Sequence, residues 1–221
     1  MLSWLSLGLV VSALAVGVHW LATRVDAIGR PRTFPWMSVV LLAVLATASA
    51  VPGLLTSLRE RHLAKVATTL VGAPAGVHCQ SLGEAFVDAG VELGYVRFRP
   101  DGTPEHDTLI KRDQCRDLAA YARSDKRDPG RAQVVAVHVL THEAMHMAGI
   151  VDEATAECAA VQRDALTARL LGASTADAHL LADRYWRTVY PSMPEGYRTP
   201  ECGPGRSLDE DSADAPWAPA G

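Results

Sequence analysis

The sequence predicts an α+β, helix-rich domain with a small sheet, preceded by two transmembrane helices. Two long uncharged stretches near the N-terminus predict the transmembrane helices. Segments with helical spacing, interrupted by one short alternating segment, predict the domain that follows them. The 221 residues are enough for one modest domain with appendages.

Residues 1–23 and 33–58 are the predicted transmembrane helices. Neither stretch contains Asp, Glu, Lys or Arg. At a rise of about 1.5 Å per helical residue, each is long enough to cross a hydrocarbon core of about 30 Å. Buried helices of soluble domains rarely run this far without a charge, so we favour two membrane spans over two core helices.

The loop at residues 24–32 is basic, with Arg24, Arg30 and Arg32 against Asp26. Short loops rich in Arg and Lys tend to remain in the cytoplasm. We therefore expect a cell-membrane protein with two spans, whose N-terminus and whose residues after Leu58 are extracytoplasmic. Basic residues directly after the second span favour the opposite orientation.

The segment Ala48-Ser49-Ala50 has the small-x-small form of a signal-peptidase site. Cleavage after Ala50 would release the domain from the membrane. Such sites arise often by chance in Ala-rich sequence, so we expect the second helix to be retained as an anchor. Either interpretation exports the domain.

The exported part is acidic. The chain has a formal net charge of −4, and three Arg and one Asp precede residue 59, so the remainder has a charge near −6. No segment of it resembles a basic patch for nucleic acid, and we expect no nucleic-acid partner.

Four Cys lie far apart after the second span, at Cys79, Cys115, Cys158 and Cys202. An even number of Cys in an exported domain predicts two disulfides. Three pairings are possible, and the spacing does not choose among them. No CxxC pair exists, which argues against a four-Cys zinc site. In a cytoplasmic domain the same residues would be free thiols.

The predicted domain covers residues 59–202. Its helices are expected at 54–70, 81–93, 113–124, 131–148, 152–171 and 174–190. Alternation at 95–99, a turn at 100–102 and a returning segment at 107–111 predict a small hairpin. Residues 203–221 are rich in Pro, Gly, Ala and Asp and predict a disordered tail.

His142, Glu143 and His146 form an HExxH pattern in the predicted helix 131–148. The two His are four residues apart, so both imidazoles lie on one face and can bind one cation. Zinc favours imidazole nitrogen, accepts a carboxylate as a third ligand and lowers the pKa of a bound water to about 7. Glu143 is the expected general base. If the two His were purely structural, the carboxylate of Glu143 would have no role in an apolar segment, where an unpaired carboxylate is costly.

Residues 140–158 resemble the active-site helix of the zincin superfamily of metallopeptidases. The chain is also similar to membrane-anchored zincin-like proteins of actinobacteria. The superfamily resemblance covers this helix and the turn after it. It implies a zinc cofactor, a small sheet packed on the helix, and an edge strand that binds substrate in extended form. Residues 95–99 are the best candidate for that strand.

The third zinc ligand has three candidates. Asp152 fits the metzincin spacing HExxHxxGxxH/D, although it is also a natural N-cap and no Met-turn follows. Glu153 and Glu157 fit a gluzincin scheme, with a shorter linker than is typical. In a helical hairpin that turns at residues 149–151, Glu157 lies level with the His pair, about 7 Å below the turn. We therefore predict Glu157, with Glu153 or Asp152 as alternatives.

These features predict a membrane-anchored zinc metallopeptidase that hydrolyses peptide bonds, with the lipid bilayer and a peptide or protein substrate as partners. The alternative is a non-catalytic, disulfide-bonded extracytoplasmic membrane protein that binds a partner and has a structural or relic HExxH helix. Metal analysis and the need for Glu143 discriminate between the two. The downstream candidates for an oxyanion donor, none of which we assign, are Tyr185, Tyr190, Tyr197, Arg184 and Arg187.

Overall fold

A computed structural model describes the chain except for residues 1, 27, 88–89, 91 and 219–221. The chain divides into two compact units, Met1–Leu58 and Arg59–Gly221.

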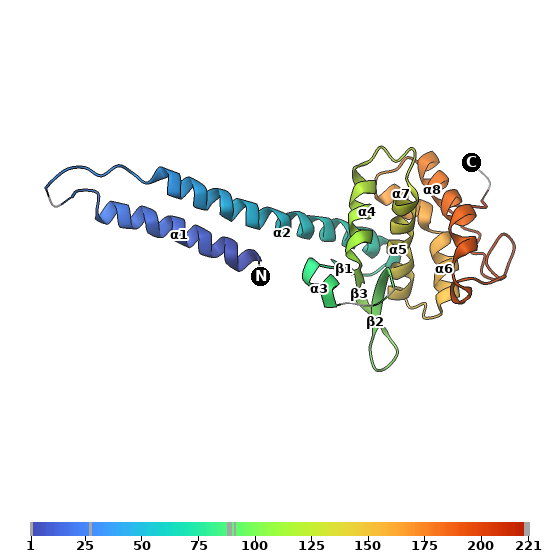
Figure 1. Cartoon of the computed structure of the whole chain (residues 1–221). Coiled ribbons are helices and arrows are strands. Elements are labelled where there is room, and N and C mark those ends of the chain that lie inside the picture. The colour runs from blue at the N-terminus through green and yellow to red at the C-terminus, as the bar shows by residue number, and fades with distance from the viewer. Residues whose placement is uncertain (1, 27, 88–89, 91, 219–221) are drawn as a thin grey trace. The chain divides into compact units, whose positions relative to one another are not determined.

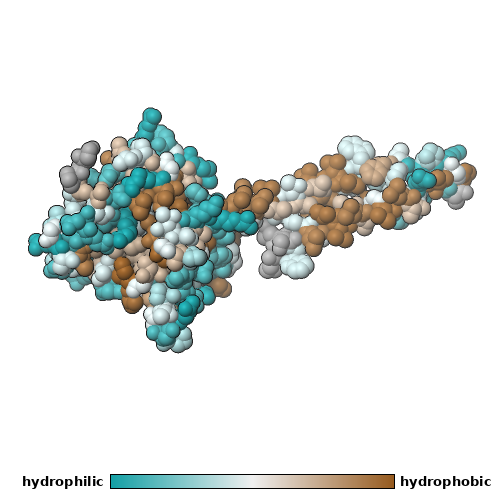
Figure 2. Space-filling model, turned by 180° about the vertical axis from the view of Figure 1, so that it is seen from behind, coloured by the Kyte–Doolittle hydropathy of each residue, from teal (hydrophilic) through white to brown (hydrophobic). Residues whose placement is uncertain are grey.

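The first unit contains α1 (Leu2–Ala22) and the first part of α2 (Trp36–Val71). Both helices are long and apolar enough to cross a membrane. They pair through Ser6 and Ser49, whose hydroxyl oxygens are 2.8 Å apart. Most of their large apolar side chains are exposed, and Figure 2 shows the resulting brown surface. Apolar surface of this extent is unusual in a soluble protein and is suited to contact with lipid.

The second unit contains a small sheet in the order β1-β3-β2. Among the described residues its strands are β1 (Gly76–Cys79), β2 (Gly94–Phe98) and β3 (Pro104–Ile110). β1 is parallel to β3, whereas β2 and β3 form an antiparallel hairpin. The hairpin agrees with the sequence-based prediction. β1 is an addition to it, because four residues are too few to show an alternating pattern.

Helices fill the rest of this unit (Figure 1). They are the last part of α2 from Arg59 on, α3 (Leu82–Val87), α4 (Arg112–Arg123), α5 (Arg131–Met147), α6 (Glu153–Val161), α7 (Asp164–Leu170) and α8 (Thr175–Thr188), followed by the 3-10 turns η1 (Tyr190–Ser192) and η2 (Glu195–Tyr197). α5 is central, because it contacts β2, β3, α4, α6, α7 and α8. Its residues from Ala136 to Met147 are all buried. A helix buried on every side directs its polar side chains into the core, where they need partners.

Two helices differ from those predicted. The predicted helix 152–171 is divided into α6 and α7, with Gln162 and Arg163 between them. Of the predicted helix 81–93, α3 covers Leu82–Val87, and residues 88–89 and 91 lie outside the described residues.

All four cysteines are paired, as Cys79–Cys115 and Cys158–Cys202. This confirms the predicted number of disulfides and selects one of the three pairings. The first bridge joins β1 to α4, and the second joins α6 to the segment after η2.

Residues 203–218 pack on the domain, in contrast to the predicted disordered tail. Leu208 and Trp217 contact the hydrophobic core. Gln162 donates from Nε2 to the Leu208 carbonyl at 2.9 Å, and its Oε1 accepts from the Glu210 amide at 2.8 Å. The composition of the segment predicts disorder, but its hydrogen bonds to the buried side-chain amide of Gln162 hold it in a fixed conformation. The domain therefore extends beyond residue 202.

Candidate metal centre

The HExxH residues lie at the C-terminal end of α5, next to a reversal of the chain. Gly149 has a φ of 105°, in the left-handed region that favours glycine, and it ends the helix. Asp152 then caps α6 by accepting hydrogen bonds from the amide of Thr155 at 2.8 Å and from its hydroxyl at 2.6 Å. The first turn of α6 thus lies beside the last turns of α5. The carboxylate of Asp152 serves as the N-cap of α6 and binds Thr155.

Three potential ligand atoms converge between these helices. His142 Nε2 lies 3.0 Å from His146 Nε2. Glu153 Oε2 lies 3.1 Å from the first of these nitrogens and 3.2 Å from the second. A tetrahedral zinc site with bonds of about 2.05 Å has ligand atoms about 3.3 Å apart. The triangle formed by these three atoms therefore has nearly the dimensions of one face of a zinc tetrahedron.

The partners of the two imidazoles at Nδ1 leave both Nε2 atoms facing this triangle. His146 donates from Nδ1 to the carbonyl of Ile150 at 2.7 Å, so its Nε2 carries the lone pair. His142 Nδ1 lies 3.1 Å from Glu157 Oε2, within ion-pair distance although not aligned as a hydrogen bond. Two nitrogens and a carboxylate oxygen so close together repel one another unless a cation or a proton lies between them. A metal ion satisfies all three at once.

Glu157, the residue favoured from sequence as third ligand, lies on the other side of the His142 ring. Its Oε2 is 3.0 Å from His138 Nε2, and its Oε1 accepts a hydrogen bond from the Tyr185 hydroxyl at 2.6 Å. The carboxylate is 1% exposed. Burial opposes its charge, but His138 and His142 hold the pKa of Glu157 far below its usual range.

The prediction of Glu157 disagrees with the geometry because α6 begins level with the histidine pair. Glu153 is the first residue of α6 and already reaches both imidazoles. Glu157, one turn later, therefore lies one turn further back along α5, between His138 and His142. A carboxylate on the far nitrogen of a ligating imidazole orients the ring and increases its basicity.

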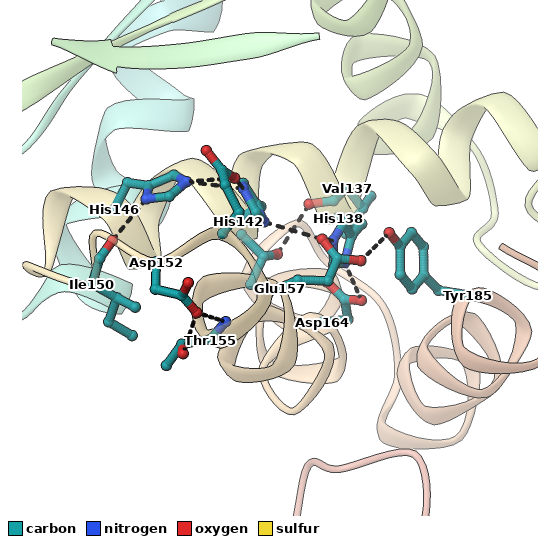
Figure 3. A network of polar contacts seen from close by, with 12 residues as sticks. Val137, His138, His142, His146, Ile150, Asp152, Thr155, Glu157, Asp164 and Tyr185 are labelled. Atoms are coloured by element: carbon teal, nitrogen blue, oxygen red, sulfur yellow. Dashed lines mark hydrogen bonds and ion pairs between the residues drawn. The ribbon is translucent and has the colours of Figure 1, made fainter. Parts of the chain in front are cut away.

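His138 is a polar core residue that the sequence-based prediction does not include. It precedes His142 by one turn, and Figure 3 shows His138, His142 and His146 along one side of α5. Its Nδ1 lies 2.9 Å from Asp164 Oδ2, and its ring stacks on Tyr185 at a centroid distance of 3.6 Å. Burial opposes its charge, but Asp164 and Glu157 outweigh burial and raise the pKa of His138 to about 10. The repeated spacing of four residues was the signal available in the sequence.

Within the described part of the chain, two groups of side chains can hold a metal ion. One is His142, His146 and Glu153, and the other is His138, His142 and Glu157. The second group is already hydrogen-bonded to Asp164 and Tyr185. The first group is the better candidate, because its three ligand atoms face one another.

Glu143 lies next to the sheet rather than in either group. Its side chain is buried, and a Cβ placed on Gly94 of β2 would come within 3.0 Å of its Oε1. Its Oε2 has no hydrogen-bond partner within the described residues. Burial raises the pKa of Glu143 to about 7. A buried carboxylate with one oxygen left unpartnered is costly, and such groups are typical of sites that transfer protons.

Comparisons with protein-family models, curated proteins and solved structures find no match. The geometry and chemistry of the site are therefore the basis for assigning a function.

Two aromatic side chains lie beside the histidines. The ring of Phe98, at the end of β2, is 6.3 Å from that of His146, and the ring of Tyr197 is 5.8 Å from that of His142. Other candidates for an oxyanion donor have partners elsewhere: Tyr185 binds Glu157, and Arg184 binds Asp128. Tyr197 is the candidate whose ring lies beside that of His142.

Proposed function

We propose that this protein is a membrane-anchored zinc metallopeptidase. The observation that supports the proposal is the convergence of His142 Nε2, His146 Nε2 and Glu153 Oε2. The buried carboxylate of Glu143 belongs to the same helix as the two histidines. Two imidazoles and one carboxylate are a donor set that zinc favours in catalytic sites. When bound, zinc supplies a water whose pKa is lowered to about 7.

The side chains of the protein then transfer the proton during hydrolysis. Glu143 accepts a proton from the attacking water as the hydroxyl adds to the carbonyl carbon of the substrate. The same carboxyl group returns the proton to the amide nitrogen as the C–N bond breaks, so that a carboxylic acid and an amine leave. Tyr197, beside His142, is the candidate to donate a hydrogen bond to the carbonyl oxygen as it gains negative charge.

A peptide is the substrate that suits the surroundings of the site. β2 pairs with β3 and lies at the edge of the sheet order. A strand edge offers backbone N–H and C=O groups to an extended peptide. Phe98 at the end of this strand would contact an apolar side chain of that peptide next to His146.

The compartment proposed is the extracytoplasmic side of the cell membrane. Both disulfides belong to the domain, and disulfides persist in oxidising compartments. The basic loop at residues 24–32 favours the cytoplasm, and α1 and the apolar part of α2 serve as the anchor.

Metal analysis of the purified full-length chain tests the proposal. We expect about one zinc per chain, and cleavage of a fluorogenic peptide library that stops when a chelator removes the metal. Glu143→Gln should keep the zinc and lose the cleavage, because the amide cannot accept the proton. Zinc binding without any Glu143-dependent cleavage would favour the non-catalytic alternative. A folded chain that takes up no zinc would refute both the site and the proposal.

Substitutions of the three acidic candidates test the ligand set. Glu153→Gln should lose zinc as His146→Ala does, because each removes a ligand. Glu157→Gln should retain zinc with an affinity lowered by roughly 10- to 100-fold, the usual effect of removing a carboxylate behind a ligating imidazole. Asp152→Asn should bind zinc like the wild type. Loss of zinc from the Glu157 variant and retention by the Glu153 variant would reverse the assignment.

A further inference from the structure

Helix α3 has an apolar surface that is exposed among the described residues of the chain. Leu82 is 59% exposed, Phe86 88% and Val87 86%, and none of the residues of this helix is buried. A surface helix of a globular domain normally turns such residues towards the core. Three large apolar side chains exposed together on six residues indicate a surface that contacts something else.

A chain of ion pairs ties α3 to the start of the domain. His78 Nδ1 lies 3.1 Å from Glu60 Oε1, and His78 Nε2 lies 3.2 Å from Glu84 Oε1. The same Glu60 oxygen accepts a hydrogen bond from the amide of Cys79 at 2.9 Å. One imidazole ring therefore separates the carboxylate of Glu60 from that of Glu84, which belongs to α3.

Glu60 follows the last residue of the uncharged stretch, Leu58, by only two positions. Two helical residues span about 3 Å, whereas the headgroup layer on each side of a bilayer is roughly 5–8 Å thick. Only the imidazole of His78 separates Glu60 from Glu84 of α3. If the uncharged part of α2 spans the membrane, α3 therefore lies within reach of the headgroup layer.

We propose that α3 inserts Leu82, Phe86 and Val87 into the outer surface of the bilayer that anchors the protein. Apolar side chains on interfacial segments enter the boundary between headgroups and acyl chains by about 5–10 Å. The proposed partner is the lipid surface, because Glu60 follows the uncharged stretch by only two positions and is joined to α3 through His78.

This inference rests on the proposed membrane anchor and deepens the proposed function. The chain leads from α3 to β2, the strand that lies against Glu143 and ends at Phe98 beside His146. Docking of α3 would hold this strand close to the bilayer. The substrate class indicated is then the extracytoplasmic segment of another membrane protein, close to where it leaves the lipid.

Site-specific fluorescence tests the docking with the full-length chain in phosphatidylcholine vesicles. All four native cysteines are in disulfides, so a Phe86→Cys variant offers a single thiol for an environment-sensitive dye. Leu180→Cys is the matched control: Leu180 is 42% exposed and lies on α8, at the opposite side of the domain in Figure 1. We expect the Phe86 label to shift its emission to the blue and to be quenched by brominated lipid, and the Leu180 label to do neither.

Equal emission and quenching of the two labels would overturn the docking. A blue shift that fades as the protein is diluted in lipid would also overturn it, because it would indicate a second copy of the chain. Alkaline carbonate extraction of the same vesicles tests the anchor separately. Zinc content and Glu143-dependent cleavage of the same samples test the proposed function, so its failure is distinguishable from failure of the docking.

Discussion

Removal of the Cys158–Cys202 disulfide should both destabilise the domain and weaken zinc binding. The two cysteines are 44 residues apart in sequence. For a closed loop of about 45 residues, the chain-entropy relation gives about 13 cal/mol/K, which is about 4 kcal/mol at 25 °C. The double variant Cys158→Ser/Cys202→Ser should lose about this much free energy of unfolding.

The effect on zinc follows from the position of the bridge. Cys158 lies directly after Glu157, on the helix that begins with Glu153. Without the bridge to Cys202, α6 loses a covalent constraint close to both carboxylates. We therefore expect weaker zinc binding even under conditions in which the variant remains folded.

The second disulfide is a matched control. Cys79 and Cys115 are 36 residues apart, so their removal should also cost about 4 kcal/mol. This bridge joins β1 to α4, and neither element carries a proposed zinc ligand. The Cys79→Ser/Cys115→Ser variant should therefore match the first in stability loss but keep the zinc affinity of the wild type.

The assay is urea unfolding of the metal-free chain in detergent, followed by near-ultraviolet circular dichroism, together with zinc titration of each folded variant. Equal zinc affinity of the two double variants would refute the proposed link between the Cys158–Cys202 bridge and the zinc site. A change of less than about 1 kcal/mol in the free energy of unfolding on removal of the Cys158–Cys202 bridge would refute the predicted stabilisation. Removal of a native bridge from a small domain typically costs about 2–5 kcal/mol.

Three further substitutions probe separate contacts. Gly94→Ala should retain zinc but slow hydrolysis by up to roughly 10²-fold, because its Cβ would displace Glu143; unchanged turnover would contradict this. Tyr185→Phe should reduce the free energy of unfolding by about 1.5–3 kcal/mol, because Glu157 loses a buried charge-assisted hydrogen bond; urea unfolding measures the loss. The guanidinium of Arg169 forms an ion pair with Asp214 and holds the pKa of that carboxyl below its usual range. This ion pair therefore stabilises the fold above about pH 4 and less so in acid. Asp214→Asn should therefore be destabilising near pH 7, with a difference from wild type that shrinks as the pH falls below about 4.

The sequence was informative where a short-range pattern decides the structure. A spacing of four residues places His142 and His146 on one face of any helix, and the structure agrees. Uncharged length alone predicts α1 and the apolar part of α2. These predictions need no knowledge of how distant elements pack.

The third ligand could not be predicted in this way. Glu153 and Glu157 are also four residues apart and share one face of α6, so both fit the pattern. The level at which α6 starts beside α5 decides between them, and that level depends on the conformation of the reversal at Gly149. The disulfide pairing and the order of residues 203–218 depend likewise on contacts between distant parts of the chain.

The contacts of Gln162 have a consequence for the timing of folding during the proposed export. Its amide is completed by the backbone of Leu208 and Glu210, and α6 is bridged to Cys202. These partners leave the ribosome some 40 to 50 residues after the helices that they complete. On the proposed topology, the helix that carries Glu153 would therefore be only partly supported while the chain is still crossing the membrane. A peptidase assembled in this order would become competent only after its domain has left the translocation channel.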